Sequence, residues 1–277
     1  MTEIGGSNDD YSVGIPGTNG EVVRIAWAAA TDTGHKRASN EDSYLARAPI
    51  FAVADGMGGH LAGDRASAAV VERLAEIVTD DFLAPRAIER ALEAATADIG
   101  VISGNSLLGV GTTVTGAILT LQDHVPFFAV FNVGDSRVYT YDAGELVQVT
   151  VDHSVVQEMV DAGTLTRDEA DQHPDSNVIT RAVGFNSAPL ADFWMLALHP
   201  GLRLLVCSDG LTKELSDERI RLHLAAGLDA ATTAGALIDS ALAAGGRDNV
   251  TTIVIDVVDA PEPGEIEDTA PRRRSTS

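Results

Sequence analysis

The sequence predicts an α+β fold in which two packed sheets are flanked by helices. Short segments that are apolar, or that alternate between apolar and polar residues, recur along the chain and are typical of strands. Two segments with helical periodicity fall between early strands, and two more precede the last strand. This order differs from the regular strand and helix alternation of a parallel sheet, and it favours packed sheets with helices outside them.

The strands are predicted from runs of apolar and β-branched residues that end at turn-forming residues. In chain order the predicted strands are Val22–Ala29, Ser43–Arg47, Ile50–Ala54, Thr113–Leu121, Pro126–Val133, Arg137–Asp142, Glu145–Val149, Trp194–Leu198, Arg203–Ser208 and Val250–Val257. No stretch with the composition of a linker interrupts this series, so we expect one folded domain over residues 22–258.

Helices are predicted where apolar residues recur every three or four positions. The four segments are Gly63–Val78, Pro85–Ile102, Asp217–Ala225 and Ala230–Ala243. Ser216 and Asp229 stand where the N-caps of the last two helices belong, and Gly227 and Gly245 follow their ends.

Three segments lie outside this regular pattern. Residues 1–21 and 259–277 lack periodicity and are expected to be flexible tails, because they bury too little apolar surface to offset the loss of chain entropy. Residues 152–180 predict two short amphipathic helices that break at Gly163, inserted between two strands. Such an insertion is either a flap beside a site or a long surface excursion.

The composition excludes several classes of partner and location. The 277 residues include 19 Lys and Arg against 41 Asp and Glu, which gives a formal net charge of −22 and disfavours nucleic acid as a partner. No apolar run is long enough to span a membrane, and the N-terminus has no basic segment before an apolar core. With Cys207 as its single cysteine, the chain is expected to be cytoplasmic.

Acidic turns recur at the ends of the predicted strands. They are Asp55-Gly56, Asp135-Ser136, Asp209-Gly210 and Asp248-Asn249. Asp-Gly and Asp-Asn are also ordinary turn formers, which is the simpler explanation for any one of them. As a set, carboxylates at the rim of buried strands require a compensating cation, and oxygen ligands without clustered His or Cys select Mg²⁺ or Mn²⁺.

A fifth acidic element, with Arg37, Glu41 and Asp42, lies just before a strand. Cations alone do not explain the arginine, whose planar guanidinium suits a pair of phosphate or carboxylate oxygens. Taken by itself, the segment is equally consistent with a cluster of surface salt bridges.

Seven motifs follow one another in order, namely TDTGHKRASNEDSY, FAVADGMGGHLAGDRAS, GVGTTVTGA, FNVGDSRVY, NVITRAVG, LLVCSDGL and GGRDNVTTIVI. Together they resemble the metal-dependent protein phosphatases, the PPM or protein phosphatase 2C-like family, in their bacterial form. The resemblance covers about residues 24–258. It implies a four-layer α-β-β-α sandwich of two mainly antiparallel sheets, with a two-metal centre at one rim of the sheets.

The resemblance also implies a role for individual residues. Two Mn²⁺ or Mg²⁺ ions are implied, with Asp55 bridging both and the carbonyl of Gly56 on one of them. Further residues implied at the metal centre are Glu41, Asp209, Asp248, Asp42 in support, and Asp135, which with Asp209 matches a third and weaker site. Arg37 is implied to bind the substrate phosphate, and Asn249 to lie beside it, orienting ligands or water. Thr113 falls near the metals.

The implied mechanism uses a water between the two ions as nucleophile, with in-line attack and no covalent enzyme intermediate. Animal members carry a histidine directly after Asp-Gly, proposed as the general acid, whereas this chain has Met57 there. His60 fills the place of the histidine found in bacterial relatives, so the proton donor stays open between His60 and water. Cys207 lies in an apolar strand and is expected to be packed, not nucleophilic.

The resemblance implies a phosphatase for phosphoserine and phosphothreonine in proteins, opposing a bacterial Ser/Thr kinase. Phosphorylated proteins are the expected partners, together with such a kinase, and the chain is expected to be a monomer. One alternative is a phosphatase of a phosphorylated anti-sigma-factor antagonist, whose members generally lack the motif formed by Arg37, Glu41 and Asp42. Another is an inactive binding module, which would lack a metal aspartate, whereas this chain retains them all.

Overall fold

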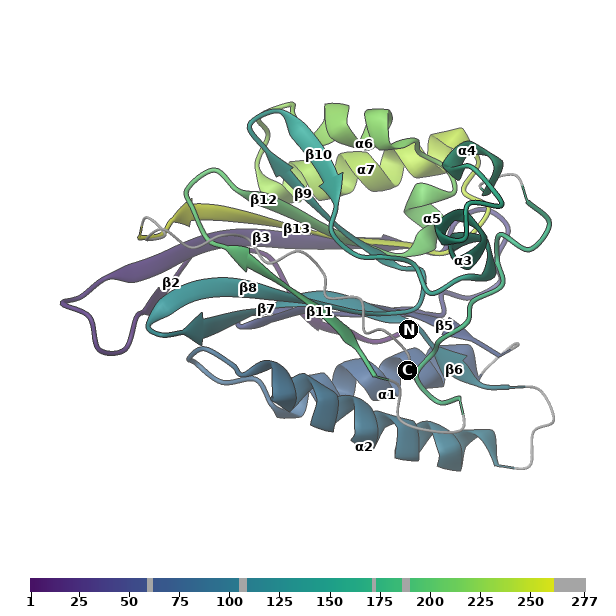
Figure 1. Ribbon diagram of the computed structural model, residues 1–277, viewed down its shortest axis with the longest axis horizontal. Helices are drawn as coiled ribbons and strands as arrows, with labels where there is room; N and C mark the ends of the chain where they lie inside the picture. Colours follow the sequence, from purple (N-terminus) through teal and green to yellow (C-terminus); the bar gives the residue numbers. More distant parts are fainter. Residues whose placement is uncertain (59–61, 105–108, 171–172, 186–189, 262–277) are drawn as a thin grey trace.

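Two mainly antiparallel sheets pack face to face, and helices cover the outer face of each, as predicted (Figure 1). The computed structural model describes the chain except residues 59–61, 105–108, 171–172, 186–189 and 262–277. No helix in these described ranges is long and apolar enough to cross a membrane.

The first sheet has the strand order β1-β4-β5-β7-β8-β11, with the short β6 paired to β5. Its strands are β1 (Glu3–Gly5), β4 (Asp42–Arg47), β5 (Ile50–Met57), β6 (Gly111–Thr112), β7 (Val114–Gln122), β8 (Val125–Val133) and β11 (Asp192–Ala197). Only β1 and β4 run parallel. Helices α1 (Gly63–Glu76) and α2 (Pro85–Ser103) cover its outer face (Figure 1).

The second sheet has the order β10-β9-β12-β13-β3-β2, and all its pairs are antiparallel. Its strands are β10 (Glu145–Gln148), β9 (Arg137–Asp142), β12 (Arg203–Cys207), β13 (Val250–Asp259), β3 (Val22–Asp32) and β2 (Asn8–Gly14). Helices α6 (Asp217–Leu224) and α7 (Ala230–Ala244) cover it, and the single turn α5 (Asp209–Thr212) follows β12 (Figure 1).

Strand β5 shows how the sequence produces these layers. Side chains alternate between the faces of a strand, so neighbouring residues enter different cores. Phe51 and Val53 pack between the two sheets, whereas Ile50, Ala52 and Ala54 pack toward α1 and α2. A near-continuous apolar run is therefore required here, because both faces of the strand are buried.

The predicted helix caps agree only in part with the structure. The Asp229 side chain accepts a hydrogen bond from the backbone N–H of Thr232 at 2.7 Å and caps α7. Ser216 occupies the N-cap position of α6, but its side chain makes no capping hydrogen bond. The α6 terminus instead has Asp217 and Glu218 in its first turn, where negative charge is favourable.

The prediction that residues 1–21 form a flexible tail is wrong, because this segment supplies edge strands to both sheets. Strand β1 pairs with β4 and strand β2 pairs with β3. Val13 and Ile15 are buried in the core between the sheets, and the indole N–H of Trp27 donates to the carbonyl of Gly6 at 2.7 Å. Edge pairing supplies the stabilisation that the Gly- and Asn-rich composition does not suggest.

The other two irregular segments are only partly described. In the inserted segment, α3 (Val155–Asp161) and α4 (Arg167–Ala170) are two short helices separated by Gly163 at φ 70°, as predicted. At the C-terminus, β13 extends to Asp259, which reaches into the predicted tail. Most of that tail, from residue 262 onward, lies outside the described residues.

Candidate active site

The predicted acids meet at the end of the sandwich where β5 finishes and α5 begins (Figure 1). Asp42 and Asp55 stand opposite each other in the antiparallel pair of β4 and β5. Burial is the largest cause that raises the pKa of Asp55, followed by the charges of Asp42, Asp209, Asp135 and Asp248. We call these five aspartates, together with Glu41, the carboxylate cluster.

Asp42 is fully buried and ties the first sheet to the second. Its Oδ2 accepts hydrogen bonds from the hydroxyls of Ser208 at 2.8 Å and Thr251 at 2.7 Å. Its Oδ1 is buried and has no hydrogen-bond partner among the described residues. Burial, as the largest cause, raises the pKa of Asp42 to about 7, although the two hydroxyls act in the opposite direction.

Asp55 and Gly56 are held through their backbone. The N–H of Asp55 donates to the hydroxyl of Thr113 at 3.0 Å, and the N–H of Thr113 donates back to the Asp55 carbonyl at 2.9 Å. A Cβ at Gly56 would lie 2.1 Å from the carbonyl oxygen of Gly63, so no other residue fits there. The predicted Thr113 thus fixes the position of the Asp55 carboxylate, and α1 begins in direct contact with this turn.

Glu41 is placed at the same point. Its carbonyl accepts from the N–H of Gly56 at 3.2 Å and from the hydroxyl of Ser67 in α1 at 2.6 Å. A Cβ at Gly63 would lie 2.4 Å from Oε2 of Glu41, which shows how closely the carboxylate approaches the start of α1.

Asp248 is paired with the predicted phosphate-binding arginine. Arg37 approaches both oxygens of Asp248, with Nε 2.7 Å from Oδ1 and Nη2 2.9 Å from Oδ2. The Arg37 side chain is 54% exposed and that of Asp248 is 18% exposed. The hydrogen bond to Asp248 raises the pKa of Arg37 most, and the charges of Asp55 and Glu41 add to it. Arg37 therefore lies at the exposed side of the carboxylate cluster.

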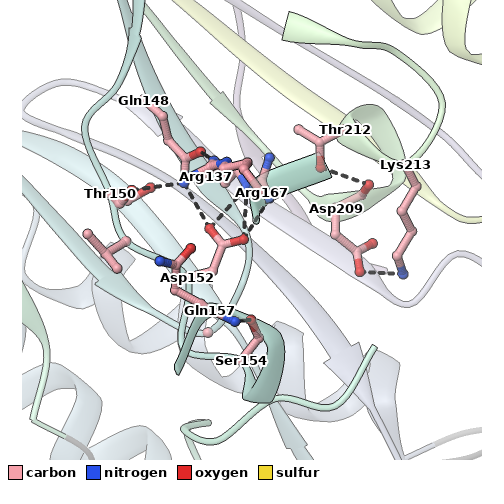
Figure 2. A network of polar contacts seen from close by, with 12 residues as sticks. Arg137, Gln148, Thr150, Asp152, Ser154, Gln157, Arg167, Asp209, Thr212 and Lys213 are labelled. Carbon is pink, nitrogen blue, oxygen red and sulfur yellow. Dashed lines mark hydrogen bonds and ion pairs between the residues drawn. The ribbon is translucent and has the colours of Figure 1, made fainter. Parts of the chain in front are cut away.

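Asp209 is paired with a lysine, Lys213, for which the sequence motifs predict no role. Lys213 follows α5, and its Nζ lies 2.5 Å from Oδ2 of Asp209 and 3.5 Å from Oδ2 of Asp248 (Figure 2). The other Asp209 oxygen, Oδ1, is buried without a hydrogen-bond partner in the described chain. The spacing of four residues is a signal that could have indicated this pair, had α5 been recognised as helical.

Asp135 lies on a turn whose backbone is hydrogen-bonded to the buried side chain of His153. Gly134, at φ 113°, donates its N–H to Nδ1 of His153 at 3.0 Å, so the ring proton is on Nε2. That nitrogen lies 3.1 Å from Oδ2 of Asp192, and the other oxygen, Oδ1, accepts from Arg181 at 2.9 Å. No site role is predicted from the sequence for His153, Asp192 or Arg181. Burial, followed by the charge of Asp209, raises the pKa of Asp135 to about 7.

A second network joins the inserted segment to β9 and β10 (Figure 2). Arg137 donates to both oxygens of Asp152 at 2.7–3.0 Å. Gln148 donates from Nε2 to Oδ1 of Asp152 at 2.9 Å, and its Oε1 accepts from Arg167 in α4. The charge of Asp152 contributes to the raised pKa of Asp135. The inserted segment is thereby connected to the carboxylate cluster.

Asn249 lies at the site, where its side chain is hydrogen-bonded to the protein backbone. Its Oδ1 accepts from the N–H of Glu41 at 2.8 Å, and its Nδ2 donates to the carbonyls of Thr33 and Ser39 at 2.8 and 3.0 Å. Both amide protons are used. Asn249 therefore holds the loop that carries Arg37 and Glu41.

Cys207 is described by the structure, whereas His60 is not. Cys207 is fully buried, and burial raises the pKa of its thiol to about 12, so it is packed and protonated as expected. His60, the candidate proton donor, lies outside the described residues.

The carboxylate cluster fits divalent cations chemically, although it is not a preformed cage. Among the described residues, no three His, Cys, Asp or Glu side chains already surround one point. Arg37 and Lys213 hold two of the aspartates. Yet buried carboxylate oxygens of Asp42 and Asp209 have no hydrogen-bond partner among the described residues. Burial, with repulsion between neighbouring carboxylates adding to it, raises the pKa of Asp42, Asp55 and Asp135. An all-oxygen donor set with this excess of charge is what Mn²⁺ or Mg²⁺ requires.

Comparison with known proteins identifies the family. The family model described as Protein phosphatase 2C matches residues 32–243. The chain is 42% identical over 242 residues to the serine/threonine protein phosphatase PstP of Mycobacterium tuberculosis, covering 85% of this chain and 45% of that protein. It is 33% identical over 239 residues to the serine/threonine phosphatase stp of Listeria innocua, covering 82% and 93%. The chain thus spans less than half of PstP but nearly all of the Listeria protein.

Solved structures agree with these sequence matches. The crystal structure of the catalytic domain of PstP in complex with two manganese ions has a TM-score of 0.75 and 39% identity, and the comparison covers 86% of this chain and 99% of that one. The extent of the family match and the identity to full-length relatives lead to one conclusion. The chain belongs to the protein phosphatase 2C family, as a relative of bacterial serine/threonine phosphatases.

Proposed function

We propose that this protein is a metal-dependent phosphatase that hydrolyses phosphoserine and phosphothreonine in proteins. The observation that carries the proposal is the carboxylate cluster with the exposed guanidinium of Arg37 at its side. The relatives that bear on it are named serine/threonine phosphatases, and one was crystallised with two manganese ions.

We propose that carboxylates of the cluster, together with the carbonyl of Gly56, hold two Mn²⁺ or Mg²⁺ ions. Asp55 and the Gly56 carbonyl lie at the centre, with Glu41, Asp209 and Asp248 around them. Asp42 supports the cluster from its buried position. When bound, the ions supply positive charge to the phosphoryl oxygens and lower the pKa of water so that it becomes a nucleophile.

The chain's own residues bind and orient the substrate. Arg37 uses Nε and Nη2 on Asp248, which leaves its Nη1 without a hydrogen bond in the described part of the chain. A planar guanidinium held in this way presents donors to a phosphate oxygen at a fixed angle. Asn249 and Thr113 fix the backbone of Glu41 and Asp55, so the carboxylates do not need to reorganise. We propose His60 or water as the donor of the leaving-group proton.

The alternatives are less well supported. Phosphatases of anti-sigma-factor antagonists generally lack the motif of Arg37, Glu41 and Asp42, and here all three residues reach the cluster. An inactive binding module would lack a metal aspartate, and each is present. We further propose that the protein acts as a cytoplasmic monomer against a Ser/Thr kinase. Its one cysteine, Cys207, is free and buried, which suits a reducing compartment.

The test measures hydrolysis of p-nitrophenyl phosphate and of a phosphothreonine peptide with Mn²⁺, with Mg²⁺ and with a chelator. We expect activity with the metals only, and its loss in Asp209→Asn. Asp239→Asn on the exposed face of α7 is the matched control, because it removes the same charge away from the cluster. Activity that survives the chelator, or full activity of Asp209→Asn, would contradict the proposal.

A further inference from the structure

We propose that the ammonium group of Lys213 is a tethered cation that takes the place of a third metal ion beside Asp209 and Asp135, so that this chain binds two divalent cations and not three. The inference rests on the proposed function, because it concerns the same carboxylate cluster. It revises the third site that the family resemblance implies at Asp135 and Asp209.

The position of Lys213 in the chain brings its ammonium group next to Asp209. Lys213 directly follows α5, and its N–H donates to the carbonyl of Asp209 at 2.8 Å. This helical spacing brings its side chain back over the aspartate, with Nζ 2.5 Å from Oδ2 of Asp209 and 3.5 Å from Oδ2 of Asp248 (Figure 2). The Lys213 side chain is 35% exposed and Asp209 only 13% exposed. The ammonium thus lies against the cluster at its partly exposed side.

The two carboxylate oxygens of Asp209 have different surroundings. Lys213 holds Oδ2, whereas Oδ1 is buried and has no hydrogen-bond partner among the described residues. One aspartate therefore offers one free oxygen to a divalent ion and gives the other to the ammonium. The lysine need not leave for Asp209 to act as a metal ligand.

The charge of Lys213 also acts on Asp135. Asp135 has no ion pair with a described residue, yet the charge of Lys213 lowers its pKa, and the charge of Asp135 in turn raises that of Lys213. The two groups are therefore close enough to interact. An ammonium paired with Asp209 and within electrostatic reach of Asp135 repels a further cation.

The charges of the site balance with two divalent cations and not with three. The carboxylate cluster holds six acids, and the described basic residues that form ion pairs with it are Arg37 and Lys213. Two divalent cations with these two basic groups neutralise six carboxylates. A third divalent ion would leave an excess of positive charge in a partly buried site, which is unfavourable until a phosphate enters.

The test counts bound ions. Purified full-length chain is stripped with chelator and titrated with Mn²⁺ to millimolar concentration, and free Mn²⁺ is measured by electron paramagnetic resonance. We expect two ions per wild-type chain, and two per chain in Lys213→Arg, which keeps the charge. We expect a third, weaker ion in Lys213→Met and in Lys213→Gln. Arg219→Met on exposed α6 removes a positive charge elsewhere and should bind two.

Three ions in the wild type, or only two in both neutral variants, would overturn the assignment of Lys213. The wild-type count decides the matter even if a neutral variant does not fold without metal. A wild-type chain that binds no Mn²⁺ contradicts the proposed function itself, so the two failures are distinguishable. Thermal unfolding in chelator gives a second readout, in which we expect Lys213→Met to unfold at a lower temperature than Lys213→Arg.

Discussion

The two halves of the carboxylate cluster compensate their negative charge by different means. In the half formed by Asp42 and Asp55, the hydrogen bonds among the described residues come from hydroxyl and backbone groups, and the pKa of both aspartates is raised. In the half formed by Asp209 and Asp248, Lys213 and Arg37 form ion pairs with the carboxylates. Without metal, the raised pKa values let the first half keep its protons to a higher pH than ordinary carboxylates do. The second half is paired with the chain's own cations.

This difference predicts what metal binding must displace. In the first half an incoming cation replaces protons, so binding strengthens as the pH rises. In the second half it competes with a guanidinium and an ammonium, which do not lose their protons near neutral pH. The same kind of side chain therefore has opposite effects on the metal-free protein, depending on the half in which it lies.

The largest expected effects come from Asp55→Asn and Asp209→Asn. A change in an outer-shell partner of a metal already costs about 10- to 100-fold in affinity or activity, so we expect each of these ligand changes to cost more than about 100-fold in kcat/KM. In chelator at pH 8 the two substitutions should change the stability of the metal-free protein in opposite directions. Asp55→Asn should stabilise the protein by about 1 kcal/mol or more, because it removes a buried repelling charge.

Asp209→Asn should instead destabilise the metal-free protein by about 1 kcal/mol, because it removes the nearer of the two carboxylates that pair with partly exposed Lys213. Urea unfolding in chelator measures both values, with Asp239→Asn as the control. Shifts of the same sign in the two variants would remove the distinction between the halves.

The second effect is a dependence of metal-free stability on pH. The pKa of Asp42 and that of Asp135 rise from 3.8 to about 7 on folding. The folded state therefore binds more protons than the unfolded state between these values. Stability is greatest below about pH 4 as far as these groups are concerned, and it falls as the pH rises to about 7, by a few kcal/mol in total.

Saturating Mn²⁺ should flatten this slope, because the metal stabilises the ionised carboxylates that the proton otherwise neutralises. The measurement is urea unfolding at several pH values between 4.5 and 8, with chelator and with Mn²⁺, which brackets the cited pKa values. Stability in chelator that rises over this range would show that the two aspartates do not carry the predicted shift.

The layered core could be predicted from sequence because it follows from local periodicity. Val22–Ala29 and Ile50–Ala54 were placed within three residues of β3 and β5, since apolar side chains must fill both faces of a buried strand. Edge strands β1 and β2 could not, because their stability comes from pairing with distant strands and not from their own composition. The single turn α5 was hidden because Asp209-Gly210 also reads as an ordinary turn.

The site was predictable to the same extent. Acids at the ends of neighbouring strands must meet at one rim, so their convergence follows from the pattern. The positions of the residues that support these acids do not follow from the pattern. Asn249 binds the backbone of Glu41 across 208 residues, and His153 supports Asp135 through Gly134. Such contacts depend on how the two sheets pack, which no local signal in the sequence reports.

The smallest expected effect concerns the inserted segment, whose described residues form no hydrogen bond or ion pair with the aspartates of either half. Arg167 in α4 donates to Gln148, and Gln148 donates to Asp152, whose charge acts on Asp135. Because Arg167 is exposed, its contact contributes about 1 kcal/mol at most. Arg167→Ala should therefore change kcat/KM for phosphothreonine peptides by only about 2- to 5-fold.

Turnover of p-nitrophenyl phosphate should stay within error in Arg167→Ala, because that small substrate needs only the carboxylate cluster and Arg37. Arg221→Ala in α6 removes an equally local arginine contact, to Glu218, and should change neither substrate. Equal losses on both substrates in Arg167→Ala would mean that the inserted segment supports the cluster structurally. A loss confined to the peptides places its influence on the protein surrounding the phosphorylated residue, beyond the reach of the metal centre.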